Sequence, residues 1–177
     1  MKYKVTALLA AITVGCAVTA GYAAEPAGEN ALLSHAKVSM NQAITVSEEQ
    51  GSGQAIDAEY IPKSGTMGIY DVKVLSMDGK KLLDFNINAE NGRVLKATRE
   101  RVQKVFTRIK PADLQSAQTP LKGAIKTAEA QTGGKAVMAG VDRRGDTVRY
   151  TVKVAMADGT TENFKVNGAD GKVASAK

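Results

Sequence analysis

The 177-residue chain has little of the chemistry that enzymes and metal sites need. Its one cysteine is Cys16, so the sequence offers no disulfide and no thiolate metal site. Its one histidine, His35, would have to serve any histidine-dependent triad or dyad, and no His-Glu-x-x-His motif is present. Glycine-rich phosphate-binding loops are absent as well. We therefore expect no enzyme activity, no cofactor and no metal site.

Two carboxylate patterns are weak signals of a site. Glu48 and Glu49 are adjacent, as an acid and a base could be, but the corresponding later pair is Glu129 and Ala130. Residues 167–171 faintly resemble a calcium loop but lack the dense carboxylates and the terminal glutamate that such a loop needs. We interpret the first pattern as a solvated helix end and the second as a glycine turn.

The chain begins like an exported protein. Basic Lys2 and Lys4 precede an uncharged run over residues 5–20, and small residues at Gly21 and Ala23 suit cleavage after Ala23. The run is short for a membrane-spanning helix. We therefore predict a signal peptide over 1–23 and a periplasmic or secreted protein. The alternative is a lipoprotein anchored at Cys16, since Thr13-Val14-Gly15-Cys16 resembles a lipobox.

Positive charge is mild and gathers in one place. Removal of the leader leaves 22 basic and 18 acidic residues, and with no tryptophan and few aromatics we expect no nucleic-acid binding. The denser stretch lies in residues 99–111 and contains Arg99, Arg101, Lys104, Arg108 and Lys110. It is either a solvated linker or a surface for an anionic lipid or polymer. Membrane contact is expected only through this linker or through a lipid on Cys16.

The chain past the leader repeats itself. Residues 40–97 and 121–176 align with two one-residue gaps, and the matches fall in order at turn and core positions. Examples are Ala43-Ile44 with Ala124-Ile125 and Glu48 with Glu129. We divide the chain into the signal peptide, an N-terminal segment 24–37, a first unit 38–98, the linker 99–111 and a second unit 112–177.

Each unit has the pattern of a helix followed by strands. Apolar residues at helical spacing open both units, and Ser39 and Thr119 are the predicted caps, the latter with Pro120 at the first helical position. Period-two strands centred on Tyr70 and Tyr150 follow. The turns between strands are marked by six residues, Asp78, Gly79, Gly92, Asp158, Gly159 and Gly171. The predicted fold is α+β, a tandem repeat of one helix packed on a three- to four-stranded antiparallel sheet, with the units packed together or sharing a sheet edge.

These motifs together resemble the PepSY domain family. The resemblance rests on the helix with Ala-Ile, the Tyr-x-Val-x-Val strand, the Asp-Gly hairpin and the closing stretches at residues 87–94 and 166–173. The resemblance covers residues 38–97 well and 119–176 nearly as well. It implies a noncatalytic domain that binds or restrains a peptidase, or an accessory of the cell envelope.

We therefore expect a protein partner such as a peptidase or a membrane sensor, reached through a strand edge or a loop. Arg143 and Arg144 are candidate partner-binding residues, because their loop differs between the two units. Arg101, Lys104 and Arg108 are further candidates, for cell-wall polymer or lipid in the alternative role of an envelope accessory. The oligomeric state is left open.

Overall fold

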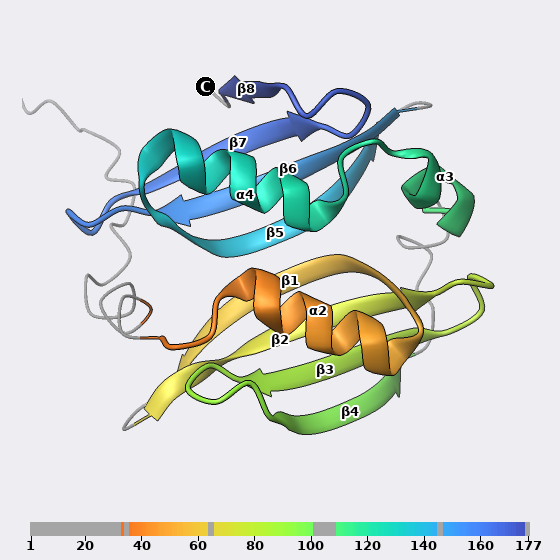
Figure 1. The fold of residues 1–177 in the computed structure, drawn as a ribbon, viewed down its shortest axis with the longest axis horizontal. Helices are drawn as coiled ribbons and strands as arrows, with labels where there is room; N and C mark the ends of the chain where they lie inside the picture. Colours follow the sequence, from red (N-terminus) through yellow and green to blue (C-terminus); the bar gives the residue numbers. More distant parts are fainter. Residues whose placement is uncertain (1–32, 34–35, 64–65, 101–108, 145–146, 176–177) are drawn as a thin grey trace, which may run out of the picture.

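A computed structural model describes residues 33, 36–63, 66–100, 109–144 and 147–175, and shows two layers, helices over a sheet (Figure 1). Residues 36–100, here the first half, begin with helix α2. Its elements are α2 (Met40–Gly51), β1 (Gly53–Lys63), β2 (Thr66–Ser76), β3 (Leu82–Asn88) and β4 (Val94–Glu100). Residues 109–175, the second half, contain α3 (Pro111–Ser116), α4 (Leu121–Thr132), β5 (Lys135–Arg144), β6 (Thr147–Ala155), β7 (Thr161–Asn167) and β8 (Val173–Ser175).

All eight strands belong to one antiparallel sheet, in the order β4-β3-β2-β1-β5-β6-β7-β8. The two halves join where β1 pairs with β5, at three residue pairs centred on Ala58 and Ala139. The predicted α+β class with an antiparallel sheet is therefore confirmed. The strands do not form two separate small sheets, because the first strand of each half completes its hydrogen bonding on the other half.

The two longer helices, α2 and α4, lie on the same face of the sheet (Figure 1). Their inward faces carry small residues such as Ala43, Ala124 and Ala128, all fully buried, so each helix can lie close to the strands. The inward strand residues include Tyr70 and Tyr150, each 1% exposed. Burying this apolar surface is the main stabilisation available to a chain without a disulfide pair.

The two helices begin differently. At α2, the Ser39 side chain accepts a hydrogen bond from the Gln42 backbone, and the Gln42 side chain accepts one from the Ser39 backbone, which forms a capping box. At α4, the N-cap residue is Pro120 and no side chain caps the helix. Thr119 is therefore not the cap that the sequence suggested, because the chain enters the helix one residue later.

Candidate functional site

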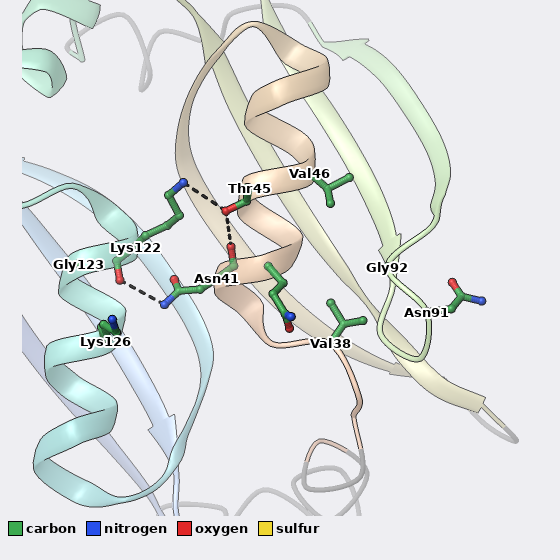
Figure 2. Close-up of a pocket in the computed structure, with 10 residues that line it drawn as sticks. Val38, Asn41, Thr45, Val46, Asn91, Gly92, Lys122, Gly123 and Lys126 are labelled. Atoms are coloured by element: carbon green, nitrogen blue, oxygen red, sulfur yellow. Dashed lines mark hydrogen bonds between the residues drawn. The ribbon is translucent and has the colours of Figure 1, made fainter.

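An open groove runs along the outer side of α2 and is here called the α2 groove (Figure 2). It has a volume of about 690 Å³. Three parts of the chain line it: α2 with Val38, two residues before the helix, the turn between β3 and β4, and the first two turns of α4. The lining residues are Val38, Asn41, Gln42, Thr45, Val46, Asn91, Gly92, Lys122, Gly123 and Lys126.

One wall of the groove is held by polar contacts between α2 and α4 (Figure 2). Asn41 donates from Nδ2 to the Lys122 carbonyl at 3.3 Å, and Lys122 Nζ donates to Thr45 Oγ1 at 3.3 Å. The same ammonium lies 2.8 Å from Glu48 Oε2. These contacts link the two halves on the helix side of the sheet and fix the width of the groove there.

The other wall rests on the first half alone. Val38 and Val46 extend from the α2 segment towards the turn that carries Gly92 (Figure 2). The backbone before α2 is fixed by two contacts: the Tyr70 hydroxyl donates to the Val38 carbonyl at 2.7 Å, and the Val38 amide donates to the Ala89 carbonyl at 3.1 Å. Burial raises the pKa of Tyr70 well above its ordinary value, so the hydroxyl stays a donor.

The repeated glutamates have a structural role. Glu48 Oε1 accepts a hydrogen bond from the Ala55 amide at 3.0 Å, and Glu129 Oε1 accepts one from the Ala136 amide at 2.9 Å. Each carboxylate thereby satisfies a backbone donor at the start of the strand that follows its helix. Glu48 therefore acts in packing the helix end, and Glu49 beside it is exposed.

A second group with unusual electrostatics is Asp57, on the sheet face away from the helices. It lies opposite Gly140 across the β1–β5 junction and opposite Lys73 in β2. Burial raises the pKa of Asp57 to about 6; Lys73 acts to lower it, while Glu59 and Asp71 raise it further. Within the described residues, no three His, Cys, Asp or Glu side chains gather as a metal site would require.

For the residues predicted from sequence as partner contacts, the structure describes no side chain. Arg143 and Arg144 end β5, and their side chains lie outside the described part of the structure. Arg101, Lys104 and Arg108 also lie outside the described residues. The groove residues were missed because they are ordinary polar and apolar types, far apart in sequence, without a recognisable motif.

The predicted turn residues lie in four connections between strands: β2–β3, β3–β4, β6–β7 and β7–β8. Asp78 Oδ1 accepts hydrogen bonds from Ser76 Oγ at 2.6 Å and from the Lys80 amide at 3.0 Å. Asp158 Oδ1 likewise accepts hydrogen bonds from the amide and the hydroxyl of Thr160. In each turn these hydrogen bonds lower the pKa of the aspartate that accepts them. The four glycines, Gly79, Gly92, Gly159 and Gly171, all have positive φ. Gly92 has φ 73° and lines the α2 groove, so the turn there is built on a conformation that favours glycine.

Comparison with known proteins agrees with this fold. Residues 37–98 match the PepSY family model, described as peptidase propeptide and YPEB domain. The chain is similar to a crystal structure of a candidate lipoprotein from Clostridium difficile 630, with a TM-score of 0.52 and 19% identity. That similarity covers 84% of this chain and 98% of the other, and concerns the fold alone. No curated protein matches the chain.

Among the described residues, none of the helices has the length and apolar character that a bilayer crossing requires.

Proposed function

We propose that the protein is a noncatalytic exported module that binds and restrains a peptidase or a membrane sensor in the bacterial periplasm. The observation that carries this proposal is the α2 groove, an open concave surface in the half that matches a family described by peptidase propeptides. A rigid sheet supports the groove from below and the α2–α4 contacts hold one side. Such a surface suits a segment of a folded partner.

The second half is proposed to be a second unit of the same kind. It has the same order of one main helix followed by four antiparallel strands as the first half. Its Glu129 and Tyr150 take the places that Glu48 and Tyr70 occupy in the first half. Two such units joined through β1 and β5 give one continuous scaffold for the groove.

Export is proposed from the leader sequence, with cleavage after Ala23. The alternative of a lipid on Cys16 is in keeping with the structural similarity to a candidate lipoprotein. Intact mass measurement of the protein purified from its host separates the two. A chain beginning at Ala24 supports the soluble form, whereas a lipidated chain beginning at Cys16 supports the anchored form.

The function is tested by adding the mature chain, residues 24–177, to a panel of periplasmic peptidases at a stoichiometric ratio. We expect at least one peptidase to be slowed and to form an isolable complex. The groove is tested with Val46→Arg, which fills it with a long charged side chain and should weaken the complex. Thr151→Arg is the matched control, because it adds the same side chain on the opposite sheet face and should leave the complex intact.

Crosslinking in the host envelope followed by purification identifies a sensor partner if no peptidase responds. A peptidase or sensor recovered at near-stoichiometric yield supports the proposal. If no peptidase is slowed and neither class of protein is recovered, the restraining role is wrong.

A second candidate role is that of an envelope accessory that binds cell-wall polymer or anionic lipid through the basic linker. The described ends of that linker favour it, since Arg99 and Lys110 are both exposed. Salt should then release the protein from sacculi or membranes. Charge reversal at Arg101, Lys104 and Arg108 should abolish retention, and retention that survives this change rules out the linker as the binding surface.

A further inference from the structure

The lining of the α2 groove differs in character from one side to the other. The side formed by Val38, Val46 and Gly92 presents two valine side chains, with Asn91 as the polar residue of the same turn. The charged residues among the described lining are Lys122 and Lys126, both on the α4 side. Among the described residues that line the groove none is acidic, so the surface offers an apolar strip beside a positive one.

The two lysines are not equivalent. Lys122 is neutralised, because its ammonium contacts Glu48 Oε2 at 2.8 Å and Thr45 Oγ1 at 3.3 Å. Lys126 is exposed, one turn further along α4, and its side chain forms no ion pair or hydrogen bond with any described residue. The groove therefore has one positive charge that is not compensated within the described structure.

From this charge pattern we infer that the occupant of the groove is an acidic amphipathic segment of the partner. An apolar side chain of that segment packs on Val38 and Val46, and a carboxylate one turn away meets Lys126. The inference rests on the proposed function, since it specifies the segment through which the partner is held.

Charge complementarity decides against other segments. A basic segment would place its cations beside Lys126 without an acidic lining residue to receive them, and like charges at close range weaken binding. A purely apolar segment would gain nothing from the Lys126 charge, because an exposed lysine keeps its ammonium in water. An acidic amphipathic segment can pack apolar side chains on the two valines and place a carboxylate beside the Lys126 ammonium.

The test uses defined probes and the mature chain. A fluorescently labelled peptide with leucines and aspartates at helical spacing is compared with the same peptide carrying lysine at each aspartate. We expect the acidic peptide to bind and the basic peptide to bind at least tenfold more weakly. Lys126→Glu should weaken the acidic peptide about tenfold, which corresponds to about 1.4 kcal/mol.

One control variant and one further groove variant complete the test. Lys165→Glu changes the net charge equally, at an exposed site in β7, and should leave the affinity unchanged. Val46→Thr keeps the shape of the side chain but replaces an apolar methyl with a hydroxyl. It should weaken binding of the acidic peptide, and the loss should be the same at low and at high salt. Threonine is compatible with this helix position, because Thr127 occupies the corresponding place in α4.

The outcomes separate this inference from the proposed function. Equal affinity for the acidic and basic peptides, or an equal loss with Lys126→Glu and Lys165→Glu, overturns the acidic segment. The same holds if a peptidase complex forms and Lys126→Glu leaves it unchanged. Acidic peptide binding that depends on Lys126, without any peptidase or sensor complex, supports the groove inference and contradicts the restraining role.

Discussion

At the scale of single residues, Asp57 shows how the junction of the two halves affects electrostatics. The carboxyl lies beside Gly140, where a Cβ would lie only 2.9 Å from Asp57 Oδ2, so the absent side chain leaves the room that Asp57 occupies. Strand pairing buries the carboxyl while placing Glu59 and Asp71 nearby, and Lys73 offsets these effects only in part. The charged form of Asp57 is therefore unfavourable in the folded protein.

Replacing Asp57 with asparagine should stabilise the protein at neutral pH. The folded pKa of about 6 lies above the ordinary value of 3.8, so folding binds a proton between these pH values. The penalty is absent below about pH 4, grows as pH rises through 6 and is complete above it. We expect Asp57→Asn to gain about 1–2 kcal/mol at pH 8, after allowance for solvent screening and loss of the Lys73 contact, and nothing at pH 3.5.

Urea unfolding across this pH range measures the effect. Glu49→Gln is the control, because it removes one negative charge from an exposed position on α2. A similar gain for both variants would mean that net charge, and not the environment of Asp57, determines the stability.

At the scale of elements, much of the structure followed from local patterns. The helices over residues 40–51 and 121–132 and the strands around Tyr70 and Tyr150 match the predicted periodicities. Local patterns do not explain every detail, because the residue in the left-handed conformation at the end of α2 is Ser52, with φ 47°, although glycines flank it on both sides. Which residue takes this conformation depends on the Glu48 carbonyl that the Ser52 amide reaches, a tertiary detail that composition does not encode.

The candidate site was beyond prediction for a related reason. Asn41, Gly92 and Lys126 meet only after the sheet brings α4 beside α2, and none belongs to a chemical motif. The residues that looked most distinctive from sequence, such as Glu48 and Glu129, instead satisfy backbone amides. Repetition therefore marked positions that hold the fold, while the groove uses positions at which the two helices differ.

The difference between the two helix starts leads to a prediction. Ser39→Ala should cost about 1 kcal/mol of stability, because it removes the side-chain acceptor for the Gln42 amide. Thr119→Ala should cost much less, since no side chain caps α4. Paired urea unfolding curves measure both changes, and equal losses would mean that Thr119 caps α4 in solution.

At the scale of the whole molecule, the join between the halves resembles a symmetric dimer interface within one chain. Ala58 in β1 pairs with Ala139 in β5, and the same two residues correspond to each other when the two halves of the sequence are aligned. The order of the strands is mirrored on either side of that pair. Such an interface uses the same strand from both partners. A unit of roughly 60 residues has only a marginal core of its own, so the pairing gives each half a larger shared structure.

This architecture predicts that the halves unfold together. Val72 in β2 and Val152 in β6 are both fully buried on strands next to the junction, one in each half. In native-state hydrogen exchange, their amides should open with the same free energy, equal to that of global unfolding. Gly140→Val places side-chain atoms against Asp57 at the junction and should lower both opening free energies by equal amounts, about 1–3 kcal/mol. If protection at Val152 falls while that at Val72 is retained, the halves are independent domains, and the β1–β5 pairing contributes nothing to the stability of the first half.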